Sequence, residues 1–177
     1  MGAVHADGAA VVVSLTAEER SVLVTMAGQV GELLMPAAAE PTDPLETLVG
    51  LTGNAVETPD DPVLRRLLPD ASPDAEAAAE FRRLTDHDLR RQKNEALTML
   101  VGDLTEPGPV TLDEEHANAW LQALNDVRLT VGTRLGVSDE GDERDGLQPD
   151  DPRQAVFVAY DWLTWLQDAI VTALTDG

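Results

Sequence analysis

The chain has 177 residues, no cysteine and a formal net charge of -21. The missing cysteine excludes disulfides, thiol catalysis and thiolate metal sites, and the charge disfavours contact with nucleic-acid phosphate or an anionic membrane. The 43% hydrophobic content is typical of a folded protein. No apolar run reaches the roughly 18 residues of a membrane span, and residues 1–7 lack the features of a signal peptide. We therefore expect one cytoplasmic domain over residues 1–177.

The beginning of the chain predicts a short strand followed by a helix. Residues 1–8 are expected to form a loose terminus, whereas Val11–Leu15 are β-branched and typical of a strand. Thr16 and Glu19 form a capping-box pattern that begins a helix, and Pro36 ends it. The expected buried face of this helix is Val22, Met26, Val30 and Leu33, with Leu23, Ala27 and Leu34 beside it.

Proline residues divide the next part of the chain. Residues 36–44 are predicted to be a linker, and Asp43-Pro44 to begin a short helix that ends near Leu51. The same Asp-Pro pattern predicts a second short helix at Val63–Leu68. Residues 74–104 follow as one bent helix or as two helices in succession.

Five of the twelve basic residues lie within twelve positions of the 74–104 segment. They are Arg82, Arg83, Arg90, Arg91 and Lys93. The simplest interpretation is that these side chains pair with neighbouring acidic residues at helical spacing.

The most informative stretch is residues 111–136, which predicts one long central helix. Thr111 and Glu114 form a capping-box pattern, and Gly136 stands where a left-handed residue would end the helix. Apolar residues recur between them at three- and four-residue spacing, which places them on one stripe. These residues are Ala117, Trp120, Leu124, Val127, Val131 and Leu135. Val110–Leu112, which overlap the start of this stretch, are expected to pair briefly with the first strand.

The last part of the chain predicts an acidic loop and an unusually apolar helix. Residues 138–151 carry seven acids and one arginine, which is typical of an exposed loop. The final helix begins at Pro152 and has two adjacent apolar rows. The first row is Val156, Ala159, Leu163, Leu166, Ile170 and Leu174, and the second is Val158, Trp162, Trp165 and Ala169. Such a helix is central to its bundle or buried at a subunit interface, so both a monomer and a homodimer are consistent with the sequence.

These elements together predict a mainly α fold, a helical bundle with long central and C-terminal helices and one short strand pair. No motif predicts catalytic residues or a cofactor. The three histidines, His5, His87 and His116, lack the spacing that would stack metal ligands on one helix face, so no metal site is expected.

The remaining candidates are polar and aromatic residues of the two long helices. They are Asn125, Asp126, Arg128, Arg134, Asp161, Trp162 and Trp165. One interpretation is structural: Arg128 and Arg134 extend from the edge of the apolar stripe to solvent, or one of them pairs with a carboxylate of the last helix, such as Asp161. The other is that these residues contact a partner or a ligand.

Several of these motifs resemble an actinobacterial family of unknown function that includes the AosR-type oxidative-stress regulators. The resemblance rests on Trp120–Leu129, Gly132–Val137 and Tyr160–Gln167, with support from Arg66–Ala71 and Glu80–Thr85, and it extends from about Val11 to Leu174. It implies a cytoplasmic protein encoded near the ClpS protease adaptor, with a role in stress-linked transcription through contact with a sigma factor. It implies no enzymatic activity. Redox sensing in this family is tied to a cysteine pair, which this chain lacks.

Two hypotheses about function follow from the sequence. The first is a non-enzymatic regulatory or adaptor protein that binds another protein, such as a sigma factor or a protease-adaptor component, and contacts neither nucleic acid nor membrane. The alternative is an enzyme or a binder of small anions, with a pocket lined by Arg128, Arg134 and the tryptophans.

Overall fold

The computed structural model describes residues 2–35, 59–137, 143–148 and 150–176. Within these residues the fold is mainly α with a small antiparallel sheet, which confirms the predicted class. The predicted linker at 36–44 and the short helix at 43–51 lie outside the described residues. In chain order the elements are β1 (Ala3–Asp7), β2 (Ala10–Ser14), α1 (Ala17–Leu34), α3 (Pro62–Leu67), α4 (Ala75–Asp103), β3 (Val110–Leu112), α5 (Glu114–Arg134), a short 3-10 helix (Glu143–Gly146) and α6 (Arg153–Asp176).

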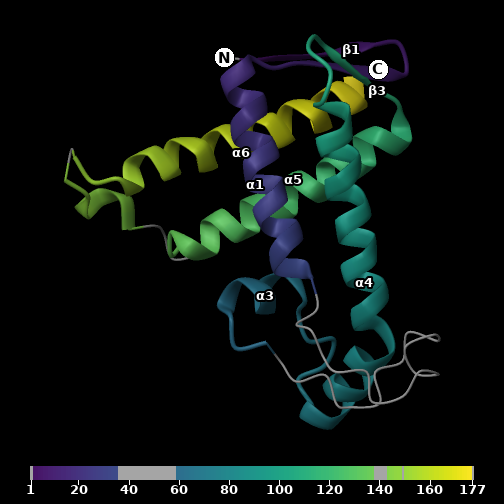
Figure 1. The fold of residues 1–177 in the computed structure, drawn as a ribbon, viewed down its shortest axis with the longest axis vertical. Helices are drawn as coiled ribbons and strands as arrows, with labels where there is room; N and C mark the ends of the chain where they lie inside the picture. Colours follow the sequence, from purple (N-terminus) through teal and green to yellow (C-terminus); the bar gives the residue numbers. More distant parts are fainter. Residues whose placement is uncertain (1, 36–58, 138–142, 149, 177) are drawn as a thin grey trace.

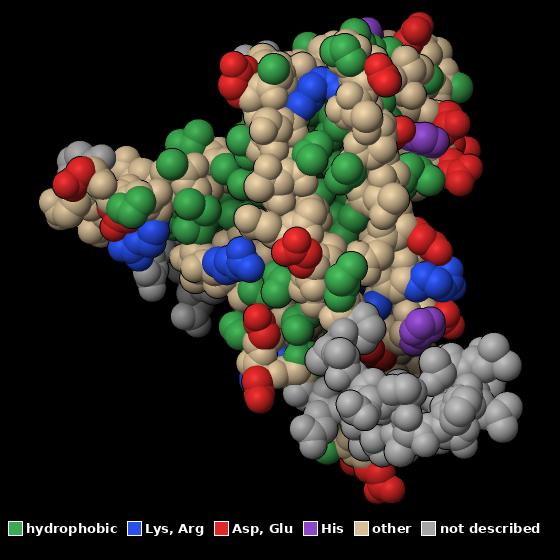
Figure 2. All heavy atoms as spheres, in the orientation of Figure 1, with side chains coloured by type: hydrophobic (Ala, Val, Ile, Leu, Met, Phe, Trp, Pro, Cys, Tyr) green, Lys and Arg blue, Asp and Glu red, His purple; other side chains and the backbone are tan. Residues whose placement is uncertain are grey.

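Helix α5 lies at the centre of the helical bundle and contacts α1, α3, α4 and α6. Figure 1 shows α1 and α4 side by side, with α5 and α6 crossing them and the sheet at one end. On the face drawn in Figure 2, hydrophobic side chains gather between α1 and α4. None of the helices in the described part of the chain has the length and apolar character needed to cross a membrane.

The N-terminal residues form a β-hairpin, so the expectation of a loose terminus at residues 1–8 was wrong. β1 pairs with β2 through a two-residue loop in which Gly8 adopts a φ of 62°, a conformation that glycine reaches without strain. The predicted strand at 11–15 is β2, one residue earlier than expected. It pairs on its other side with β3, as predicted, and the strand order is β1-β2-β3.

Helix α1 begins with the predicted capping box, in which Thr16 and Glu19 exchange side-chain and backbone hydrogen bonds. Its predicted buried face was partly wrong. The helix buries the neighbouring row Leu23, Ala27, Val30 and Leu34, whereas Val22 is 41% exposed. Both rows are apolar, and the helix turns the second one towards its neighbours α4 and α5.

Helix α4 is one continuous helix of 29 residues that begins at the cap Asp74. Its basic side chains pair with acids, as predicted. The pairs are Arg82–Asp70, Arg83–Glu80, Arg90–Asp86, Arg91 with both Asp88 and Glu95, and Lys93–Asp126. Consistent with this pairing, Lys and Arg side chains are interspersed with Asp and Glu on the face drawn in Figure 2.

The apolar stripe of α5 is buried along its whole length, which confirms the prediction. The predicted N-cap was wrong. Thr111 belongs to β3, and the Asp113 carboxylate instead caps the helix by accepting the N–H of His116 at 2.9 Å. The C-terminal end follows the expected pattern: Gly136 has a φ of 71°, and the Val137 N–H donates to the Gly132 carbonyl at 2.9 Å.

The Asp103 carboxylate joins the end of α4 to the first turns of α5. One of its oxygens lies 2.8 Å from the His116 Nδ1 and accepts a 2.8 Å hydrogen bond from the indole N–H of buried Trp120. This hydrogen bond from His116 to Asp103, with the nearby charges of Asp113 and Glu115, raises the pKa of His116 above its ordinary value of 6.5.

The His116–Asp103 contact predicts a pH dependence of stability. Because the His116 pKa is raised in the folded state, its stabilising contribution is complete below pH 6.5 and is lost as the pH rises through the folded-state pKa. We expect the melting temperature to fall across this range and the fall to be smaller in His116→Gln. Parallel profiles for the two proteins would contradict this assignment.

Gly132 allows α5 and α6 to approach closely. A Cβ atom built at this position would lie 3.0 Å from Cε2 of Tyr160, so the close helix crossing accounts for a glycine inside the helix.

This contact predicts that the effect of Gly132→Ala on stability changes sign when Tyr160 is replaced by alanine. Gly132→Ala should gain about 1 kcal/mol of helix propensity but lose more to overpacking against Tyr160, with a net cost of about 1 kcal/mol. In a Tyr160→Ala background the same substitution should be stabilising. Urea unfolding of the four proteins measures the difference, and equal effects in both backgrounds would contradict the steric explanation.

Candidate protein-binding groove

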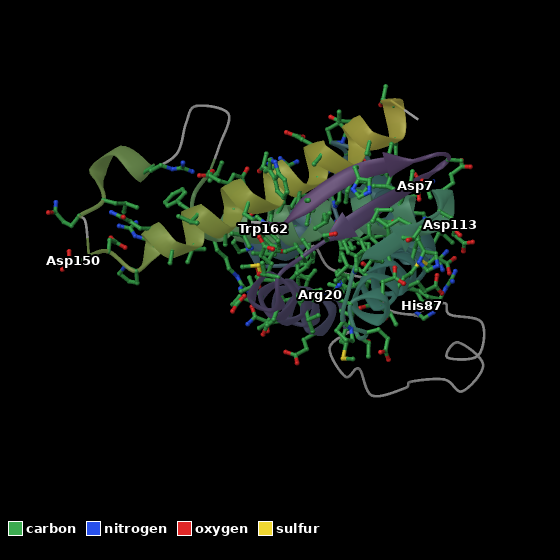
Figure 3. The ribbon with its side chains drawn as sticks, turned by 90° about the horizontal axis from the view of Figure 1, so that it is seen from above. Asp7, Arg20, His87, Asp113, Asp150 and Trp162 are labelled. Carbon is green, nitrogen blue, oxygen red and sulfur yellow. The ribbon has the colours of Figure 1, made fainter. Side chains whose placement is uncertain are left out.

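A groove of about 760 Å³ lies between strand β1 and the outer face of α6. Val4, His5 and Ala6 form its strand wall, and residues of α6 between Asp161 and Ala173 form its helix wall. Figure 3 shows β1 running alongside the C-terminal half of α6, and the two elements are in contact.

The helix wall exists because α6 has more apolar surface than the bundle covers. Leu163, Leu166 and Ile170 are fully buried against the core. The second predicted row is covered only in part: Trp165 and Ala169 are half-buried, and other residues at the ends of both rows are exposed. Val158 is 69% exposed, Val156 38% and Leu174 36%. The prediction of a broadly apolar helix was therefore right, and its partly covered side lines the groove.

The rim of the groove is acidic at two positions of α6. Asp161 accepts two hydrogen bonds of 2.9 Å from Arg144, whose guanidinium also lies 4.7 Å above the ring of Phe157. Asp168 is exposed and makes no ion pair with any described residue. One rim carboxylate is thus balanced by an arginine and the other is not.

The Arg144 contact modifies the expectation of an exposed acidic loop at 138–151. Residues 138–142 and 149 lie outside the described part of the chain. Glu143–Gly146 form a short 3-10 helix, and the ion pair between Arg144 and Asp161 connects it to α6. Phe157, under this guanidinium, is only 3% exposed, so this segment covers part of the final helix.

The strand wall presents an edge that pairs with no other described strand. In the order β1-β2-β3, β1 is hydrogen-bonded to β2 only. Alternate residues of an edge strand direct their N–H and C=O groups outwards, where they can pair with another chain. The groove therefore combines backbone hydrogen-bonding groups on one wall with apolar and acidic side chains on the other.

The structure separates the residues that the sequence analysis grouped together. Asp161 and Trp165 line the groove, whereas Trp162 does not, and its buried indole nitrogen has no partner within the described residues. The predicted pairing of Asp161 with an arginine of α5 was wrong, since Asp161 pairs with Arg144 instead.

Sequence reasoning missed the strand wall because residues 1–8 were assigned to a loose terminus. Gly8 between two short runs was the available signal for a hairpin.

The polar candidates of α5 lie inside the bundle or apart from the groove. Asp126 is 1% exposed at its side chain and accepts a 2.6 Å hydrogen bond from Lys93 of α4. Burial raises the pKa of Asp126, and the Lys93 ammonium opposes that rise. Arg128 is half-buried and donates to the Asn125 amide oxygen at 3.4 Å, while Arg134 is exposed. Asp126 is therefore part of the contact between α4 and α5, and none of these four residues lines the groove.

The Lys93–Asp126 pair predicts a large single-mutant effect. Lys93→Met leaves the Asp126 carboxylate buried without its partner and should destabilise the protein by about 3 kcal/mol at neutral pH. The loss should shrink as the pH falls, because protonation of Asp126 removes the unpaired charge. The double variant Lys93→Met/Asp126→Leu should recover most of the stability in urea unfolding. A double variant as unstable as the sum of the two single ones would contradict the coupling.

No group of three or more His, Asp or Glu side chains in the described ranges is placed to hold a metal ion. The groove combines a strand edge, a half-buried aromatic residue and an acidic rim, which are features of a binding surface.

Comparison with known proteins identifies the family. The family model described as a domain of unknown function, DUF2017, matches residues 1–174. The chain belongs to the DUF2017 family. Its relatives include the oxidative stress regulator AosR of Mycobacterium tuberculosis strain H37Rv and that of Mycobacterium bovis, each 34% identical over 91% of this chain and 80% of the relative. The putative oxidative stress regulator AosR of Mycobacterium leprae is 35% identical over 77% of this chain and 69% of the relative.

No solved structure matches this DUF2017 chain. The predicted resemblance to the AosR-type family is confirmed by the family match and by these mycobacterial relatives.

Proposed function

We propose that this DUF2017 protein is a non-enzymatic, cytoplasmic regulator of the oxidative-stress response that acts by binding another protein in the groove between β1 and α6. Relatives at 34–35% identity are named oxidative stress regulators, which supports the biological role. The observation that carries the mode of action is the groove, because an open strand edge and an incompletely covered tryptophan face each other across it.

The composition of the groove fits a protein partner. Tryptophan is enriched among the residues that contribute most to protein–protein binding, and Trp165 is only half-buried in this structure. The net charge of -21 favours a partner with a basic surface. The family resemblance suggests a sigma factor or a protease-adaptor component as that partner. Since the chain has no cysteine, its regulation does not use a thiol of its own.

The alternative of an anion-binding pocket receives less support. It requires Arg128 and Arg134 to converge on one ligand with the tryptophans. Arg128 instead contacts Asn125, Arg134 is exposed, and neither arginine lines the groove. We therefore propose the protein-binding function alone.

A genetic complementation experiment with two matched variants tests this function. Thr172 and Val171 are adjacent and both exposed on α6, but only Thr172 lines the groove. Thr172→Arg places bulk and positive charge in the groove, whereas Val171→Arg makes the same charge change outside it. In a strain that lacks the gene, the wild type and Val171→Arg should restore survival and transcript induction after peroxide treatment, and Thr172→Arg should not.

Circular dichroism and melting curves of both variants provide the control for folding. If the deletion strain responds to peroxide as the parent does, the regulatory role is wrong. If Thr172→Arg complements as well as Val171→Arg, the role stands but the groove is not its binding surface.

A further inference from the structure

We propose that the groove binds its partner by β-strand addition: an extended segment with alternating apolar and basic side chains pairs with β1 as a fourth strand. This inference rests on the proposed function, since it specifies the partner of the same groove. It adds the partner's conformation, its side-chain pattern and the backbone groups that hold it.

The hairpin geometry identifies the backbone groups that are available. Gly8 is at the first loop position with a positive φ and Ala9 has a negative one, so the two-residue loop closes on Asp7 and Ala10. In a hairpin closed in this way, hydrogen-bonded pairs alternate with pairs that point outwards. Val4 and Ala6 therefore direct their N–H and C=O groups away from β2, and both residues line the groove.

The edge lacks three features that often prevent strand addition. Edge strands are commonly protected by lysine, proline or a bulge. β1 has none of these: its sequence is Ala-Val-His-Ala-Asp, and its register with β2 is continuous from Ala3 to Asp7. Small side chains at Ala3 and Ala6 leave the backbone accessible to an incoming chain.

The helix wall determines the side-chain pattern of the partner. Side chains of an added strand alternate between two faces, so every second one points towards α6. There it meets Trp165, Ala169 and Ala173, which supply an apolar surface. An extended segment with an apolar residue at every second position fits this wall.

Charge complementarity distinguishes a basic segment from a second copy of the chain. Asp168 on the helix wall and Asp7 at the end of β1 are exposed carboxylates, while Asp161 is balanced by Arg144. Pairing β1 with its own copy would bring together two chains that each carry a charge of -21, which long-range repulsion opposes. Lysine or arginine on the partner would instead be attracted to the rim.

A synthetic peptide tests the proposal with the full-length protein. The probe is a fluorescent hexapeptide of alternating lysine and valine, and its binding is measured by anisotropy at low and high salt. Ala6→Pro removes one outward N–H that makes no hydrogen bond to β2. Proline is tolerated at such an edge position. We expect this variant to weaken binding about tenfold, the effect of losing one main-chain hydrogen bond.

Three controls separate strand addition from charge attraction. Ala6→Ser keeps the N–H and the small side chain, so its affinity should stay close to that of the wild type. Asp168→Asn should weaken binding at low salt and have little effect at high salt, because salt screens the exposed carboxylate. A peptide of the same sequence that is N-methylated at alternate residues should bind weakly, because it cannot complete the strand.

Any of the following results would overturn the proposal of strand addition. Absence of binding, or equal binding to the wild type and Ala6→Pro, would exclude strand addition at β1. A dimer of the protein alone that Ala6→Pro abolishes would assign the edge to a second copy. These results leave the complementation experiment unaffected, so failure of this proposal and failure of the regulatory function can be told apart.

Discussion

Two polar contacts at matching positions fix how α4 and α5 pack. Lys93 binds Asp126, and ten residues further along α4 Asp103 binds His116, which lies ten residues earlier on α5. Ten helical residues span about 15 Å, so the antiparallel pair is held at two points along its length. A helical slide would break both contacts at once and leave buried polar groups unpaired. Because α5 contacts four other helices, this register positions the rest of the bundle.

Internal pairing of basic residues also determines the character of the surface. The basic side chains of α4 all bind acids, and Arg20 of α1 donates to the carbonyls of Leu104, Glu106 and Gly108 in the turn after α4. These cationic groups thus stabilise the fold, while the excess of acids gives the protein a negative field. The negative field attracts a partner with a basic surface, and it repels the phosphates of nucleic acid.

The sequence was sufficient to predict the fold class and the helices whose signals are local. The stripe from Ala117 to Leu135 has an unambiguous helical period, and Gly136 ends it. Local signals failed where two of them competed or where pairing came from far away. Thr111 and Asp113 are both acceptable caps, and only the pairing of Thr111 with Val12 in the sheet decides between them. β1 has little strand propensity of its own, and the Lys93–Asp126 pair joins residues 33 positions apart. The strand wall of the groove was missed because β1 itself has little strand propensity, and Gly8 alone marked its local pairing with β2.

The order of the strands has a consequence for the way the chain folds. β1 and β2 pair across a two-residue loop, a local step that takes microseconds. β3 pairs with β2 across nearly a hundred residues, as in the partners Val13 and Val110, and closing so long a loop has a greater entropic cost. During synthesis at about 5–20 residues per second, the hairpin is made before α6. The groove is built from both, so a nascent chain has no groove until α6 has been synthesised.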